Sequence, residues 1–166
     1  MIPGAEQIYQ FIQITAGRCG RPRLLVVDDE EGPRAAVTIL FRPEFDVLAL
    51  NSSELALIAC AQRCFDVAVS DNRRAGMSGI ECLAHMRKID PTVPVIMLSA
   101  FATREMICRA VKLNAFGVLE KPFDIWELRD AVITALRLRR SGHPLPPLDS
   151  RPFPRWWRER LANSSW

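Results

Sequence analysis

The strongest constraint in the sequence is a regular alternation of short apolar runs and longer segments with helical periodicity between residues 23 and 140. Short apolar runs bounded by turn residues are typical of strands buried on both faces of a sheet. The runs are 24–27, 46–50, 66–70, 93–99 and 115–120. Because each run is followed by a helical pattern, the order predicts an α/β fold with a five-stranded doubly wound parallel sheet and helices on both faces.

The intervening segments place apolar residues on one face at helical spacing. The predicted helices begin near Pro33 and at residues 54, 79, 103 and 124. Ser52 or Ser53 can cap the second of these helices, and Ser78 starts the third. A further short amphipathic helix is predicted over residues 5–16, before glycines and Pro22 interrupt the pattern.

Composition excludes several other classes of protein. No apolar run approaches the roughly 18 residues of a transmembrane helix, and the N-terminus has no basic start or long apolar region typical of a secretory signal. The five cysteines are an odd number, so free thiols in a reducing cytoplasm are the simplest interpretation. Cys60 and Cys64 lack the additional clustered ligands that a zinc site needs. We therefore expect a cytoplasmic location.

Basic residues gather at the C-terminal end. The whole chain has a net charge of +3, while residues 137–166 hold seven arginines against two acids, so this end carries +5 and the rest −2. Prolines are frequent there and disfavour a long helix or strand. An Arg/Trp cluster around Trp156 and Trp157 can contact nucleic acid, a membrane surface, a partner or the domain itself. Self-packing or a disordered end is the favoured interpretation, and direct nucleic-acid binding is not expected.

Polar residues follow four of the predicted strands. Asp28 and Asp29 end the first strand and Asp71 the third; Ser99 ends the fourth, and Lys121 follows the fifth. Carboxyl ends of parallel strands lie at one edge of a sheet, where ligands bind. Three neighbouring carboxylates repel one another unless a cation is present, and Mg²⁺ prefers such oxygen ligands. Asp71 is then a candidate nucleophile that forms an acyl phosphate.

Each of these residues alone has an ordinary structural explanation. Aspartates favour turns after strands, Ser99 can cap a helix, and Lys121 can be a solvated surface lysine. The combination is more specific, because every polar residue falls at the same end of its strand.

Residues 23–140 resemble the receiver domain of two-component response regulators. The matching segments are LLVVDDEE at 24–31, DNRRAGMSG at 71–79, VIMLSA at 95–100 and LEKPF at 119–123. The resemblance implies a flavodoxin-like sheet with strand order 2-1-3-4-5. With the receiver domain at 23–140, we expect residues 1–22 to form an N-terminal extension and residues 141–166 a Pro/Arg/Trp-rich tail, which is too short for a helix-turn-helix output domain.

The resemblance also implies the chemistry of the site. Asp71 accepts a phosphoryl group from a phosphohistidine on a sensor histidine kinase or phosphotransfer protein. Ser99 and Lys121 bind that group, and the bond to Pro122 is cis. The implied Mg²⁺ ligands are Asp28, Asp29, Asp71 and the backbone carbonyl of Arg73.

The expected function is a phosphorylation-dependent signalling switch that acts through contact with a downstream protein. It is not an enzyme beyond its own phosphoryl transfer and dephosphorylation. We expect a monomer or a phosphorylation-linked homodimer.

Three positions depart from the pattern of the family. Arg74 and Ala75 replace an apolar residue and a proline, and Val118 replaces the aromatic residue three positions before the lysine. Arg74 can compete with Mg²⁺, steady a phosphoryl group or face solvent. These departures leave open a second function, in which a degenerate receiver serves as a phosphorylation-independent binding module.

Overall fold

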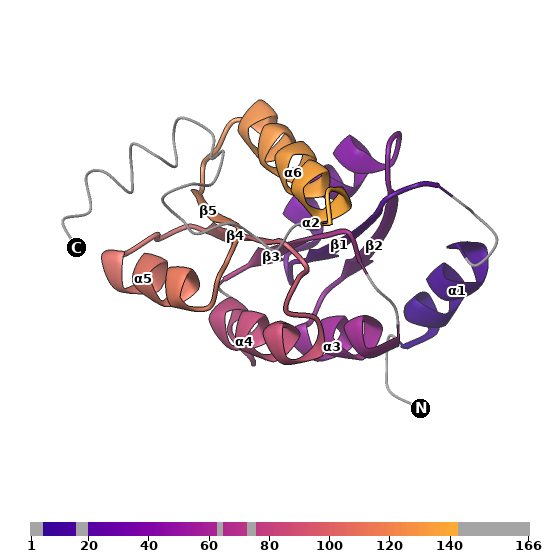
Figure 1. Ribbon diagram of the computed structural model, residues 1–166, viewed down its shortest axis with the longest axis horizontal. Coiled ribbons are helices and arrows are strands. Elements are labelled where there is room, and N and C mark those ends of the chain that lie inside the picture. Colours follow the sequence, from indigo (N-terminus) through magenta and orange to yellow (C-terminus); the bar gives the residue numbers. More distant parts are fainter. Residues whose placement is uncertain (1–4, 16–19, 63–64, 73–75, 143–166) are drawn as a thin grey trace.

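A five-stranded parallel sheet forms the centre of the molecule, in a computed structural model that describes residues 5–15, 20–62, 65–72 and 76–142 (Figure 1). The strand order is β2-β1-β3-β4-β5, so the predicted fold class and strand order are confirmed. The strands are β1 (Arg23–Val27), β2 (Asp46–Leu50), β3 (Val67–Asp71), β4 (Val95–Ser99) and β5 (Gly117–Glu120).

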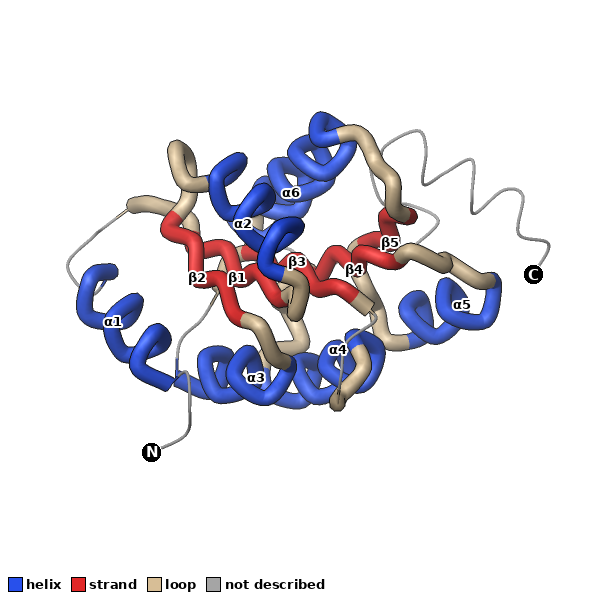
Figure 2. Tube along the Cα trace, turned by 180° about the vertical axis from the view of Figure 1, so that it is seen from behind, coloured by secondary structure: helices blue, strands red, loops and turns tan. Residues whose placement is uncertain are grey.

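Helices cover both faces of this sheet. Helices α2 and α6 lie on one face, and α3, α4 and α5 lie on the other, with α1 extending that second layer beyond α3 (Figures 1 and 2). The helices are α1 (Ala5–Thr15), α2 (Glu31–Phe41), α3 (Ser53–Gln62), α4 (Gly79–Ile89), α5 (Arg104–Lys112) and α6 (Ile125–Arg140). None of the helices within the described ranges is long and apolar enough to cross a membrane.

Side-chain caps explain where several helices begin. The Ser52 hydroxyl accepts a hydrogen bond from the backbone N–H of Leu55 at 3.2 Å, whereas Ser53 lies inside α3. This selects Ser52 among the two predicted caps. Ser78 and Asp124 each form a capping box at the start of α4 and α6, which satisfies backbone donors at the helix N-terminus.

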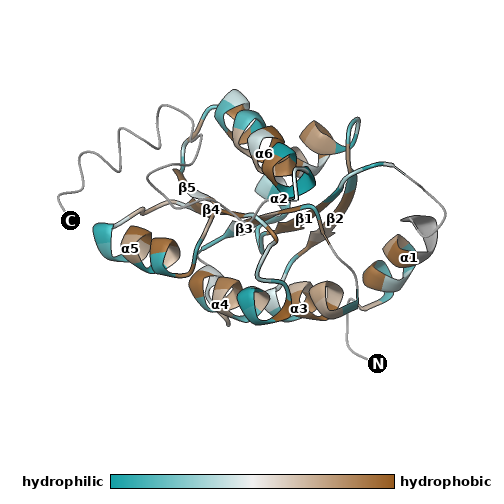
Figure 3. Cartoon of the chain, viewed as in Figure 1, coloured by the Kyte–Doolittle hydropathy of each residue, from teal (hydrophilic) through white to brown (hydrophobic). Residues whose placement is uncertain are grey.

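Apolar side chains fill the space between the sheet and each helical layer. Strands β3 and β4 are buried along their whole length, as expected for strands covered on both faces. Hydropathy follows this arrangement, with hydrophobic residues along the strands and on parts of the helices that face them (Figure 3). The core thus fixes the strands, and with them the residues at the strand ends.

Helix α1 packs on the same core as α3. Ile8 is almost completely buried, and the ring of Phe11 stacks on that of Phe65 with the centroids 6.1 Å apart. The sequence indicated the amphipathic helix but not its contact with Phe65, two residues before β3. The domain boundaries after residues 22 and 140 stay predictions, and residues 143–166 lie outside the described residues.

An ion pair at the opposite edge of the sheet gives a prediction for acid stability. Asp90, after α4, accepts hydrogen bonds from Thr92 and lies 2.8 Å from the Arg139 guanidinium of α6. Partial burial would raise the pKa of Asp90, but the bonds from Thr92 and the charge of Arg139 outweigh it, so the pKa lies below its ordinary value of 3.8.

A carboxylate whose pKa is depressed by folding stabilises the fold above its unfolded pKa, and this contribution is lost as the pH falls through the folded pKa. We expect Asp90→Asn to lower the free energy of unfolding at neutral pH by about 1 kcal/mol. The difference from wild type should shrink below about pH 4 in urea titrations. Asp130→Asn, at an exposed position of α6, is the control. A difference that stays constant at acid pH would contradict the assignment.

Candidate functional site

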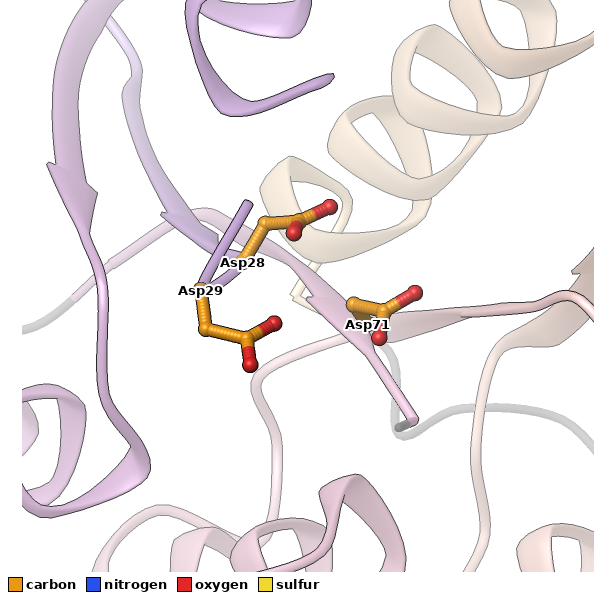
Figure 4. A group of neighbouring side chains, drawn as sticks. All are labelled: Asp28, Asp29 and Asp71. Atoms are coloured by element: carbon orange, nitrogen blue, oxygen red, sulfur yellow. The ribbon is translucent and has the colours of Figure 1, made fainter. Parts of the chain in front are cut away.

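The carboxyl edge of the sheet brings three aspartates together (Figure 4). Parallel pairing of β1 and β3 places Val27 opposite Ser70, so the next residues along, Asp28 and Asp71, are neighbours. One carboxylate oxygen from each of Asp28, Asp29 and Asp71 lies within 4.8 Å of the other two. The convergence that the strand ends predict is therefore present.

The three carboxylates differ in exposure. Asp28 and Asp71 are only 3% and 5% exposed, whereas Asp29 is exposed. Carboxylate oxygens are ligands that Mg²⁺ prefers, with water completing the coordination. The donor set and its partly open position thus fit a hard divalent cation.

Lys121 supplies a positive charge inside this acidic cluster. Its Nζ lies 2.8 Å from Asp71 Oδ1 and 3.4 Å from Asp28 Oδ2. Burial alone would lower the pKa of Lys121, but the hydrogen bond and charge of Asp71, together with those of Asp28, outweigh it and raise the pKa above 10.5. The ammonium group is therefore fully charged at neutral pH.

Asp28 is less readily ionised than an ordinary aspartate. Burial raises its pKa above 3.8, and the charge of Asp71 acts in the same direction. The backbone N–H of Glu30, 2.9 Å from Asp28 Oδ1, and the charge of Lys121 oppose this shift without cancelling it. A further cation at this site would favour the ionised form of Asp28.

A backbone hydrogen bond connects Ser99, at the end of β4, with Lys121, the residue after β5. The N–H of Lys121 donates to the carbonyl of Ser99 at 2.8 Å, so both polar side chains belong to the same edge. Ser99 is fully buried, and its hydroxyl accepts a hydrogen bond from the N–H of Phe101 at 3.2 Å. The bond between Lys121 and Pro122 is cis, as the resemblance implies. Val118 is completely buried in the core.

The segment that follows Asp71 is only partly described. Arg73, Arg74 and Ala75 lie outside the described residues, so the backbone carbonyl of Arg73 as a Mg²⁺ ligand and the effect of Arg74 stay predictions. Beyond this gap, the N–H of Gly79 donates to the carbonyl of Asn72 at 3.0 Å. This bond ties the start of α4 to the acceptor strand.

The sequence pattern did not predict that Arg34 contacts the site. Arg34, in the first turn of α2, donates from Nη1 to the backbone carbonyls of Asp28 at 2.8 Å and Asp29 at 3.3 Å. Nothing in helical periodicity distinguishes it from a solvated arginine. Only the path of the chain from β1 into α2 brings its guanidinium back to the acidic residues.

These features define a doubly wound α/β domain with an acidic, lysine-containing site at the carboxyl edge of its sheet. The model of the response regulator receiver domain matches residues 24–133. The chain therefore belongs to the response regulator receiver family, as the motifs predicted.

Individual relatives support this assignment. The chain is 34% identical over 118 residues to sporulation initiation phosphotransferase F of Bacillus subtilis, covering 70% of this chain and 95% of that protein. It is 33% identical over 132 residues to response regulator protein PilR of Pseudomonas aeruginosa, covering 79% of this chain and 30% of PilR. The chain thus spans about a third of the length of PilR, and 31% of that of the regulatory protein AtoC of Escherichia coli.

Solved structures agree on the fold. A response regulator receiver domain from Clostridium thermocellum has a TM-score of 0.69 at 27% identity, covering 74% of this chain and 99% of that one. A CheY-like receiver domain from Methanospirillum hungatei has a TM-score of 0.72 at 21% identity, covering 75% of this chain and all of that one. At this lower identity, the second match supports the fold alone.

Proposed function

We propose that this chain is a phosphorylation-dependent signalling switch in which Asp71 accepts a phosphoryl group from a phosphohistidine. The observation that carries the proposal is the pairing of the buried Asp71 carboxylate with Lys121 Nζ at 2.8 Å, beside the carboxylates of Asp28 and Asp29. The donor is a sensor histidine kinase or a phosphotransfer protein, and the output is contact with a downstream protein.

Each residue of the site has a different role in this phosphoryl transfer. An Asp71 carboxylate oxygen attacks phosphorus, the P–N bond of the phosphohistidine breaks, and the imidazole nitrogen keeps the electron pair. Asp28, Asp29, Asp71 and the Arg73 carbonyl would hold Mg²⁺, which, when bound, neutralises phosphoryl oxygens. Lys121 and Ser99 then pair with oxygens of the new acyl phosphate. Hydrolysis of that phosphate resets the switch, so the chain catalyses only its own phosphorylation and dephosphorylation.

Phosphorylation adds charge and acceptor oxygens at a crowded edge. Ser99 would exchange its bond from the Phe101 N–H for one to the phosphoryl group, and the loop before α5 would move with it. The altered face of α5 and β5 is the surface offered to the partner. We place this receiver at residues 23–140, between the extension and the tail, in the cytoplasm, as a monomer or a phosphorylation-linked homodimer.

Phosphorylation of the isolated chain tests the proposal. Incubation with Mg²⁺ and acetyl phosphate should add one phosphoryl group, as an acid-stable and base-labile adduct measured by intact mass. Asp71→Asn should abolish the adduct because the amide is a poor nucleophile. Asp130→Asn, at an exposed site on α6, should leave it unchanged. An adduct that persists in Asp71→Asn would reject the assignment of the acceptor.

Val118 supports a second candidate function. Its small side chain is fully buried at the position that holds an aromatic residue in the family pattern, and Arg74 and Ala75 also depart from that pattern. A degenerate receiver that binds its partner without phosphorylation would form no adduct. Unimpaired partner binding by Asp71→Asn, together with no adduct on the wild-type chain, would favour this alternative.

A further inference from the structure

We propose that Arg34 is a positioning residue for the cation site, because its guanidinium holds the two backbone carbonyls of the acidic pair. This inference rests on the Mg²⁺ site of the proposed function. It adds a residue outside the carboxylates, the hydroxyl and the lysine of that site. Its role is to fix the β1–α2 loop in the conformation that presents Asp28 and Asp29 to a shared cation.

The hydrogen bonds of the loop support this role. Nη1 of Arg34 is 2.8 Å from the carbonyl oxygen of Asp28 and 3.3 Å from that of Asp29. Both bonds go to main-chain oxygens and not to the carboxylates. Both bonds come from the single nitrogen Nη1, which carries two N–H groups. The planar, permanently charged guanidinium fixes the directions in which these two groups point.

Other hydrogen bonds fix different parts of this loop. The N–H of Asp28 donates to Leu50 of β2 at 3.1 Å, and the N–H of Glu30 donates to the Asp28 carboxylate at 2.9 Å. The first bond fixes the start of the loop, and the second fixes one carboxylate. Asp29 is exposed, and the bond from Arg34 to its carbonyl oxygen restrains the peptide group between Asp29 and Glu30.

Arg34 itself is held by the helix. Its N–H donates to Glu30 at 3.2 Å, and its carbonyl accepts from the Thr38 hydroxyl at 2.7 Å. The side chain is partly buried, which limits the orientations from which it reaches back. The arginine therefore links the backbone of Asp28 and Asp29 to helix α2.

Geometry and charge make opposite predictions for this residue. If Arg34 acted only as a nearby positive charge, its removal would strengthen cation binding by reducing repulsion. If Arg34 positions the ligands, its removal weakens Mg²⁺ binding, even though loss of its positive charge by itself would favour the cation. Outer residues that orient metal ligands typically contribute 10–100-fold to metal affinity.

The test measures Mg²⁺ binding to the full unphosphorylated chain by isothermal titration calorimetry, without a phosphodonor. We expect Arg34→Gln to raise the Kd for Mg²⁺ by about tenfold. Arg34→Lys should raise it by less, since an ammonium group keeps the charge and has several N–H donors but lacks the fixed planar geometry of the guanidinium. Arg129→Gln is the matched control, because it removes the same charge from a surface pair with Glu44. Its Kd should equal that of wild type.

Melting in EDTA separates affinity from folding. Variants that melt near wild type and bind Mg²⁺ more weakly support the inference. A Kd for Arg34→Gln equal to or below that of wild type overturns it, as does a wild-type chain that binds no Mg²⁺. Should Arg34→Gln fail to fold, a wild-type Kd in Arg34→Lys overturns it instead. A chain that binds Mg²⁺ in this pattern but takes no phosphoryl group from acetyl phosphate would defeat the proposed function and leave this inference standing.

Discussion

Replacing Lys121 by methionine is expected to lower the free energy of unfolding in EDTA by about 2 kcal/mol. The ammonium group lies 3.4 Å from the carboxylate of Asp28 and 2.8 Å from that of Asp71. Without it, two buried negative charges face each other across a few ångströms. Removal of one partner from a fully buried pair costs roughly 3–5 kcal/mol, and the 23% exposure of Lys121 reduces this value.

The pH dependence of this loss follows from the direction of the pKa shift. Folding raises the pKa of Lys121 above 10.5. With both carboxylates ionised, its contribution is therefore complete from neutral pH up to the unfolded pKa, and it is lost as the pH rises through the folded pKa. Urea unfolding monitored by circular dichroism should show the full difference at neutral pH and a smaller one at strongly alkaline pH.

Added Mg²⁺ should restore part of the stability of Lys121→Met, because a cation that binds only the folded state stabilises it. Asp28→Asn in the same background should also recover stability by removing one of the two buried charges. Lys88→Met, at an exposed position near the end of α4, is the matched control and should be nearly neutral. Equal stabilities for Lys121→Met and Lys88→Met would show that the pairing of Lys121 with Asp28 and Asp71 does not stabilise the fold.

The sequence predicted the sheet and most of the site because both depend on the ends of apolar runs. Asp28 directly follows β1 and Asp71 is the last residue of β3, and these two strands are neighbours in the sheet, so parallel pairing alone brings the two residues together. Ser99 and Lys121 reach the same edge by the same rule. The end of an apolar run in the sequence therefore predicts which side chains lie at the carboxyl edge of the sheet.

Features that depend on the path of a loop or on helix packing could not be predicted in this way. Arg34 lies on a helix whose periodicity identifies the buried face, but a bond back to the preceding loop leaves no repeat in the sequence. The stacking of Phe11 on Phe65 likewise joins segments that no pattern relates. The pairing of Lys121 with Asp71 depends on side-chain conformation, which strand order does not determine.

Gly79→Ala is expected to destabilise the fold by about 3 kcal/mol and to suppress phosphorylation of Asp71. A Cβ atom at position 79 would lie against the carbonyl oxygen of Asp71 and 2.7 Å from the Cα atom of Asn72. Both atoms belong to the backbone, so neither can rotate away as a flexible side chain would. The added methyl group must therefore push the start of α4 away from the acceptor strand, and the bond from Gly79 N–H to Asn72 is stretched or lost.

Gly32→Ala is the matched control for this substitution. Gly32 lies in the first turn of α2, and a Cβ atom there meets no heavy atom within 4 Å. Alanine favours a helix over glycine, so Gly32→Ala should leave stability unchanged or raise it by up to about 1 kcal/mol. Because the two variants add the same methyl group at the start of a helix, a difference between them measures the close approach at Asp71. Equal stability and equal adduct formation with acetyl phosphate would mean that α4 can withdraw from β3 without cost, and that this contact does not hold the acceptor in place.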